Sequence, residues 1–283
     1  MNIYFSPCPN DTFIFHAWAH GLIPDAPELD VTYADIDITN KIVFSKNNKP
    51  DILKISYAAL PWALSEYALL PCGGALGRGC GPLLLTNNEA SAEDPASLSG
   101  KRVAVPSEKS TAYLLFRLWA AGHVQGGVGE IIVMPFHEIM PAVRDGKIDA
   151  GLVIHEARFT YPSYGLTMMV DLGNWWESDT DLPIPLGAII AHKSLNLEAI
   201  SSWIRASVQY AWKHPEASKD YVMKHAQEMS PEVAKAHINL YVNEFSANLG
   251  DKGYEAIHTL LNRAAEQGLV PKISLSQLRM KIP

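Results

Sequence analysis

Short apolar segments alternate with helix-forming segments from the start of the chain, and this alternation constrains the fold more than any other feature. Strand-like runs occupy residues 3–5, 29–33 and 52–55, and stretches of helical character separate them at residues 12–20 and 39–44. A strand, a helix and a second strand in succession form the unit from which parallel sheets are built. The sequence therefore predicts an α/β fold with a mainly parallel sheet.

The same rhythm restarts near Leu98. The preceding stretch, residues 87–97, is polar and contains Pro95, as expected of a linker. Beyond it lie a strand around Val103, a helix at residues 112–121 and two further strand-like runs, at residues 131–134 and 150–154. A second stretch with several prolines, residues 181–187, marks a return crossing.

The two crossings divide the chain into two predicted lobes. We expect residues 1–97 and 187–283 to form a larger α/β lobe, and residues 98–186 to form a smaller α/β lobe inserted into it. A chain of 283 residues is long enough for two such domains. A cleft between two α/β lobes, lined by loops at the carboxyl ends of strands, is a preferred place for a ligand.

After residue 194 the pattern becomes helical. Apolar residues three and four positions apart form two stripes: Ile200, Trp203, Ile204, Val208, Ala211 and Trp212, and then Tyr254, Ile257, Leu260, Leu261 and Ala264. An amphipathic helix buries one face. We therefore interpret both stripes as core packing rather than as a cofactor site.

Composition excludes several functional classes. The net charge is −7 and no cluster of lysine and arginine is present, which disfavours nucleic-acid binding. No apolar run approaches the roughly 18 residues of a membrane span, so we expect no membrane insertion. The first residues lack the pattern of a secretory signal, and Cys8, Cys72 and Cys80 form no disulfide or zinc-site spacing. Thiols of this kind suit a reducing cytoplasm, where we expect the protein.

Polar residues directly follow the first predicted strand. The segment Ser6-Pro7-Cys8-Pro9-Asn10-Asp11-Thr12 combines two prolines with hydrogen-bonding side chains. Asp11 is a candidate N-cap for the helix at residues 12–20. Two interpretations stay open: a rigid turn that caps a helix, or a loop in which Asn10, Asp11 or Thr12 binds the ligand.

Hydroxyl groups stand between a strand and a helix at two further places. Ser56 and Tyr57 follow the strand at residues 52–55, and Ser110 and Thr111 precede the helix of the inserted lobe. Free N–H groups at the start of a helix, with hydroxyls beside them, bind carboxylate or phosphate. Each pair alone is equally consistent with simple capping. One pair in each predicted lobe favours a site for a small anion.

The apolar run at residues 150–154 ends abruptly in His155-Glu156-Ala157-Arg158. A histidine at the end of a strand is a candidate general base, because imidazole titrates near neutral pH. The alternative is a structural histidine. The segment lacks the second histidine of a zinc-peptidase motif, and the chain has no Gly-x-Ser-x-Gly elbow, so we expect neither a metal site nor a serine hydrolase. Arg158 either orients a substrate or pairs with Glu156.

Several of these segments resemble one enzyme family. Residues 6–13, 54–58 and 154–161 are similar to those of the 1,4-dihydroxy-6-naphthoate synthases, which act in the futalosine route to menaquinone. The opening Ser-Pro-Cys-Pro-Asn-Asp is unusual and specific. The likeness continues at residues 174–177 and 182–187, so it covers most of the chain, although the C-terminal helices contribute little.

The resemblance implies a two-lobed fold like that of the type 2 periplasmic binding proteins, with a ligand cleft between the lobes. It implies a lyase that converts cyclic dehypoxanthine futalosine, an anionic small molecule, to 1,4-dihydroxy-6-naphthoate without a metal or organic cofactor. By the same resemblance, His155 is the proton acceptor. Ser56 and Tyr57, with Ser110 and Thr111, belong to the substrate-holding loops of the two lobes.

Two other functions fit the same fold. A solute-binding protein for a small carboxylate has this architecture, but the absence of a signal pattern and the presence of His155 count against it. A chorismate dehydratase of the same pathway also has a similar fold. The Ser-Pro-Cys-Pro-Asn-Asp opening favours the synthase over the dehydratase.

Overall fold

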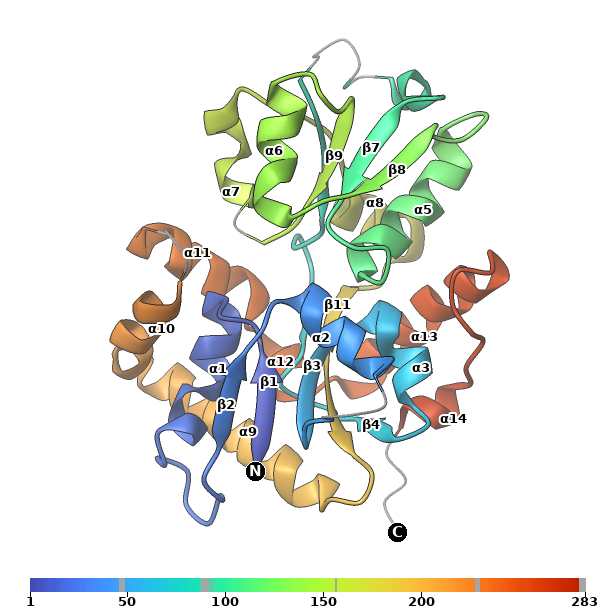
Figure 1. Cartoon of the computed structure of the whole chain (residues 1–283). Helices are drawn as coiled ribbons and strands as arrows, with labels where there is room; N and C mark the ends of the chain where they lie inside the picture. The colour runs from blue at the N-terminus through green and yellow to red at the C-terminus, as the bar shows by residue number, and fades with distance from the viewer. Residues whose placement is uncertain (46–48, 88–91, 93, 156, 227–229, 280–283) are drawn as a thin grey trace. The chain divides into compact units, whose positions relative to one another are not determined.

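A computed structural model describes residues 1–45, 49–87, 92, 94–155, 157–226 and 230–279. The chain forms two compact units (Figure 1). The first comprises Met1–Gly77 and Pro185–Pro283, and the second, Arg78–Ile184, is inserted between these two parts.

The second boundary, between Ile184 and Pro185, lies within the predicted crossing at residues 181–187. The first boundary, between Gly77 and Arg78, lies well before the predicted position at residue 97. The reason is strand pairing, because β6 (Leu83–Thr86) hydrogen-bonds to two strands of the second unit. The polar stretch that suggested a linker therefore follows a strand of the inserted unit. Its residues 88–91 and 93 lie outside the described residues.

The first unit contains one mixed sheet. Its strands are β1 (Asn2–Phe5), β2 (Asp30–Tyr33), β3 (Ile52–Ser56), β4 (Tyr67–Leu69), β5 (Ala75–Gly77) and β11 (Ile184–His192), whose first residue belongs to the second unit. The order is β2-β1-β3-β11-β4, and β5 also pairs with β11. Strand β1 is parallel to β2 and β3, as the alternating sequence predicts, whereas β11 is antiparallel to β3 and β4. The prediction of a mainly parallel sheet is therefore wrong at β11, the strand on which the chain returns from the second unit.

The first unit also contains several helices. They are α1 (Pro9–Ala19), α2 (Ile36–Val43), α3 (Leu60–Ala63), α9 (Leu197–Lys213), α10 (Lys219–His225), α11 (Pro231–Tyr241), α12 (Glu244–Ala247), α13 (Gly250–Glu266) and α14 (Leu275–Leu278), with the 3-10 turns η1 (Tyr57–Ala59) and η4 (Pro215–Ser218). No helix in the described parts of the chain is long and apolar enough to cross a bilayer.

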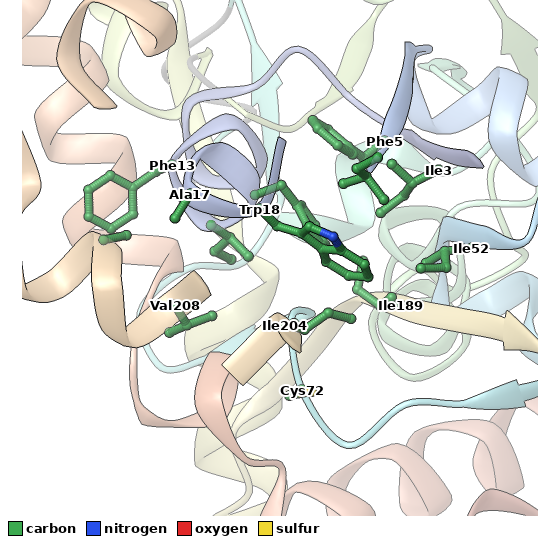
Figure 2. Close-up of a cluster of buried hydrophobic side chains, with 14 of the residues drawn as sticks. Ile3, Phe5, Phe13, Ala17, Trp18, Ile52, Cys72, Ile189, Ile204 and Val208 are labelled. Atoms are coloured by element: carbon green, nitrogen blue, oxygen red, sulfur yellow. The ribbon is translucent and has the colours of Figure 1, made fainter. Parts of the chain in front are cut away.

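The core of the first unit gathers around Trp18 of α1. Figure 2 shows its indole ring among Phe5, Ile189 and Ile204, which come from β1, β11 and α9. The indole N–H donates a hydrogen bond to the Pro27 carbonyl at 2.9 Å, so the buried ring leaves no polar atom unpaired. Burying one large apolar side chain contributes about 1.5–3 kcal/mol, so this cluster holds α1 and α9 firmly on the sheet.

Both predicted C-terminal stripes lie on helices of this unit. The buried residues of α13 include every member of the second stripe, which confirms that stripe as core. In α9, four residues of the first stripe are buried: Ile200, Ile204, Val208 and Ala211. Trp203 packs on the core from its edge. Trp212 is 41% exposed, so its assignment to the core is wrong; it follows Ala211 directly, and adjacent helical positions point in different directions.

The second unit is also built on a mixed sheet, in the order β10-β6-β9-β7-β8. Besides β6 its elements are η2 (Pro95–Leu98), β7 (Arg102–Val105), α5 (Thr111–His123), β8 (Glu130–Val133), α6 (Phe136–Arg144), β9 (Ala150–Val153), α7 (Ala157–Thr160), η3 (Tyr161–Tyr164), β10 (Thr167–Asp171) and α8 (Leu172–Thr180). Strand β7 is parallel to β8 and β9, whereas β6 is antiparallel to β9 and β10.

Strand β9 is packed closely against helix α6. A Cβ atom added at Gly151 would lie 2.6 Å from Cγ2 of Ile139 and 2.8 Å from Cγ2 of Val143. Only glycine permits this approach of helix and strand. The position of the strand end that precedes His155 is therefore fixed by the packing of α6.

Candidate active site

Polar segments of the first unit gather at one edge of its sheet. Strands β1 and β3 are parallel neighbours, so the loops that follow them lie at the same edge. This places the predicted segment at residues 6–12 close to Ser56 and Tyr57. The carboxyl edge of parallel strands is where open α/β sheets bind ligands.

Asp11 is completely buried and forms an ion pair with Lys54 of β3. Its carboxylate also accepts hydrogen bonds from the Ser6 hydroxyl at 2.7 Å and from Asn10 Nδ2 at 2.8 Å. A buried carboxylate is tolerated when it is paired in this way. Asp11 therefore joins the first loop to the strand that carries Ser56.

The prediction that Asp11 is an N-cap is wrong. Helix α1 begins at Pro9, with Cys8 as its N-cap, and Asp11 lies in the first turn. Proline favours the first helical position because its φ is already helical and its missing N–H is not needed there. The helix therefore starts earlier than the carboxylate suggested.

The side chains of Asn10 and Thr12 also form hydrogen bonds with other residues of the first unit. Asn10 Oδ1 lies 3.0 Å from Nε2 of His237, and the Thr12 hydroxyl donates to the Cys8 carbonyl at 3.1 Å. These contacts hold the turn rigid. That Asn10, Asp11 or Thr12 contacts a substrate stays a prediction.

Ser56 ends β3 and is held by Asn40 of α2. Its backbone N–H donates to Asn40 Oδ1 at 2.8 Å, and Asn40 Nδ2 donates to the Ser56 hydroxyl oxygen at 3.0 Å. The helix predicted to follow, at residues 58–64, consists of a 3-10 turn at Tyr57–Ala59 and the short α3 at Leu60–Ala63.

Tyr57 is fully buried, and none of the described residues makes a hydrogen bond to its hydroxyl group. Burial raises the pKa of this phenol, and the nearby Tyr254 raises it further. The Tyr57 hydroxyl therefore keeps its proton near neutral pH. It is available as a hydrogen-bond donor inside the first unit.

In the second unit, α5 begins at Thr111, one residue before the predicted start, and Ser110 is its N-cap. The Ser110 hydroxyl accepts a hydrogen bond from the Tyr113 N–H at 3.2 Å and donates to the Ser107 carbonyl at 2.8 Å. Ser110 and Thr111 are both buried. The helix of thirteen residues brings the positive end of its dipole to this loop.

His155 follows β9, the central strand of the second sheet. Its backbone φ is +55°, a left-handed conformation that few residues other than glycine adopt. Its ring meets the Phe136 ring edge-on, with centroids 5.7 Å apart. Residues held in such backbone conformations cluster at functional sites, so the geometry favours a functional histidine.

Arg158 has a defined structural partner. One guanidinium nitrogen lies 2.5 Å from an Asp171 carboxylate oxygen, and the other donates to the Gly81 carbonyl at 2.8 Å. The alternative partner Glu156 lies outside the described residues. These contacts fix α7, the helix that follows His155, to Gly81 and to the junction between β10 and α8. A role of Arg158 in substrate binding stays a prediction.

The sequence analysis missed four residues that contact the candidate site residues: Lys54, Asn40, Asp171 and His237. The sequence pattern around Lys54 could have indicated its role, because a lysine inside an apolar strand requires a buried partner. The pattern around Asp171 could have done so too, since Asp171 precedes a helix and accepts from the N–H groups of Gly173 and Asn174 as an N-cap. No local sequence pattern indicates the roles of Asn40 and His237. Their roles depend on contacts with residues 16 and 227 positions away.

Within each unit, the predicted residues therefore lie at the same edge of a sheet. Strands β7 and β9 are parallel neighbours, so the loop before α5 and His155 both follow carboxyl ends of the second sheet. That the two sets face each other across a cleft stays a prediction.

Solved structures place this architecture in a known class. A crystal structure of an Archaeoglobus fulgidus protein matches 95% of this chain and 98% of its own with a TM-score of 0.85 and 32% identity. The periplasmic aliphatic sulphonate-binding protein of Escherichia coli matches 99% of this chain and 92% of its own with a TM-score of 0.70 at 12% identity. The second match concerns the fold alone. The chain has a periplasmic-binding-protein-like fold.

Sequence comparison identifies the family. The model of a family described as menaquinone biosynthesis matches residues 1–266. The 1,4-dihydroxy-6-naphthoate synthase of Streptomyces coelicolor is 64% identical over 96% of this chain and 95% of its own length. That of Thermus thermophilus is 43% identical over 95% of both chains. The chain therefore belongs to the menaquinone biosynthesis family and is an enzyme of that pathway, which confirms the resemblance seen in the sequence.

Proposed function

We propose that this enzyme is a carbon–carbon lyase that converts cyclic dehypoxanthine futalosine to 1,4-dihydroxy-6-naphthoate. The observation that carries the proposal is the 64% identity, over nearly the full length, to a relative named for this product. The reaction removes the sugar-derived fragment while the second ring becomes aromatic. This chemistry needs a base, donors for the developing oxyanion and a site for the carboxylate.

His155 is the proposed base. It follows a strand held by close packing, and the Arg158 contacts hold the helix on its other side. A general base works best when its geometry is fixed in advance. In its neutral form the imidazole accepts a proton from the substrate and so allows the carbon–carbon bond to break.

The proposed donors come from both units. In the second, the N-terminus of α5 at Ser110 and Thr111 binds the anionic part of the substrate or its developing negative charge. In the first, Ser56 and Tyr57 supply hydroxyl groups.

We also propose that the protein is located in the cytoplasm.

The direct test is product analysis. The purified protein is incubated with cyclic dehypoxanthine futalosine, and in parallel with chorismate, and the products are separated by chromatography. The proposal expects 1,4-dihydroxy-6-naphthoate from the first substrate only. Dehydration of chorismate would identify a chorismate dehydratase, and binding without any conversion would identify a binding protein.

Replacing Ser110 and Thr111 by alanine together should raise KM about 10-fold with a smaller effect on kcat. The physical reason is that Ser110 caps α5 and so holds its first turn, and the interaction of a helix N-terminus with a charged ground-state group lowers KM without lowering the barrier. Steady-state kinetics checks this. Ser230→Ala is the matched control, because Ser230 caps α11 by accepting from the Val233 N–H. It should lose similar cap stability and leave KM unchanged, and an unchanged KM in the double variant would place the anion elsewhere.

A further inference from the structure

The contacts between Asn40 and Ser56 determine whether the Ser56 hydroxyl donates or accepts a hydrogen bond toward a ligand. Both residues are almost completely buried, at 1% and 3% exposure. The backbone N–H of Ser56 is only a donor, so the group of Asn40 that faces it must be the carbonyl oxygen. The two contacts together fix the orientation of the Asn40 amide, and its NH₂ group therefore faces the Ser56 hydroxyl oxygen.

In this orientation the Ser56 hydroxyl oxygen accepts a hydrogen bond from Asn40, and the hydroxyl hydrogen stays available for donation. A serine hydroxyl has one hydrogen to donate and two lone pairs to accept. In the described residues the Ser56 hydroxyl accepts from Asn40, and it makes no capping bond to the turn that follows it. A buried hydroxyl hydrogen without an acceptor is unfavourable. Its acceptor is therefore expected to come from a bound molecule.

Ser110 provides the contrast. Its hydroxyl donates to the Ser107 carbonyl and accepts from the Tyr113 N–H, so its hydrogen is already in use. The two serines had the same predicted role from their position between strand and helix. Their hydrogen bonds separate them, because Ser110 caps a helix through its side chain and Ser56 does not.

We propose that Asn40 is a positioning residue that fixes Ser56 as a hydrogen-bond donor, so that this position selects a carboxylate oxygen of the substrate. This inference rests on the proposed function, which assigns Ser56 to the substrate. It adds the polarity of the contact and names Asn40 as the residue that sets it. A ligand presenting a donor at this point would leave the Ser56 hydrogen unpaired and would be rejected.

The test reverses the polarity of Ser56. In Asn40→Asp the second carboxylate oxygen replaces the NH₂ group, so it accepts the Ser56 hydrogen and turns it away from the ligand. We expect KM for cyclic dehypoxanthine futalosine to rise roughly 10- to 100-fold, which is the loss of one hydrogen bond to a charged group, with a smaller change in kcat. Binding of two probes is measured by calorimetry: 1,4-dihydroxy-6-naphthoate and 1,4-dihydroxynaphthalene, which lacks the carboxylate. Wild type should prefer the first, and Asn40→Asp should lose most of that preference.

A double-mutant cycle separates this effect from simple repulsion by the new charge. If Asn40 acts through Ser56, Asn40→Asp should change little once Ser56→Ala is present. If the added charge repels the ligand directly, the effect of Asn40→Asp should be the same in both backgrounds, which would overturn the inference. Thermal unfolding of each variant verifies that it is folded, and Asn40→Ser, which keeps a small polar side chain, serves as a second variant if Asn40→Asp does not fold.

The outcomes distinguish the two proposals. Wild-type product formation together with an unchanged KM and probe preference in Asn40→Asp would overturn the role of Asn40 and leave the proposed function standing. A wild-type protein that neither converts the substrate nor binds either probe would overturn both.

Discussion

Replacing His155 by asparagine should lower kcat about 10²- to 10⁴-fold, the range that a positioned general base contributes. Asparagine keeps a hydrogen-bonding side chain of similar reach but accepts no proton near neutral pH. It also tolerates the left-handed backbone at φ +55°, so the substitution adds little strain. The variant should therefore fold normally and still bind cyclic dehypoxanthine futalosine. Single-turnover kinetics and calorimetric binding measure the two effects separately.

The pH profile supplies an independent check. Histidine takes up a proton between about pH 5 and 8, and the protonated ring is no longer a base. The wild-type rate should therefore fall on acidification, whereas the residual rate of the variant should lack this dependence. His137→Asn is the matched control, because the side chain of His137 is 81% exposed, and it should retain wild-type turnover. Near-wild-type turnover in His155→Asn would mean that another residue is the base.

Replacing Asp11 by alanine should lower the free energy of unfolding by about 3–5 kcal/mol. That is the effect of removing one partner from a buried ion pair and leaving the other charge unpaired. Here the charge left behind is Lys54, whose side chain is only 6% exposed, and the hydroxyl of Ser6 also loses its acceptor. Urea denaturation followed by circular dichroism measures the change.

An exposed carboxylate gives the control for this experiment. Asp37 pairs with Lys41 on the surface of α2, and Asp37→Ala should change the free energy of unfolding by no more than about 0.5 kcal/mol. Adding Lys54→Met to Asp11→Ala should recover part of the lost stability, because the unpaired charge is then removed. If Asp11→Ala were as stable as the wild type, the ion pair would not support the first loop.

The local pattern of the sequence determined most of the elements and the start of α5. Apolar residues at spacings of two and of three to four report which side of a segment is buried, and this information is local. It predicted the strands before Ser56 and His155, and it placed Ser110 and Thr111 at the start of a helix. The family followed from short motifs, because the Ser-Pro-Cys-Pro-Asn-Asp opening is itself a local feature.

Tertiary structure decided which segments pair and which side chains meet. The boundary moved from residue 97 to residue 77 because β6 pairs with β9 and β10, and pairing between distant strands leaves no trace in local periodicity. The same holds for the antiparallel direction of β11. Lys54 meets Asp11 across 43 residues, and Asp171 meets Arg158 across 13. A sequence indicates that a buried charge needs a partner, but only the folded chain selects that partner, because the selection depends on distances between segments that the sequence keeps apart.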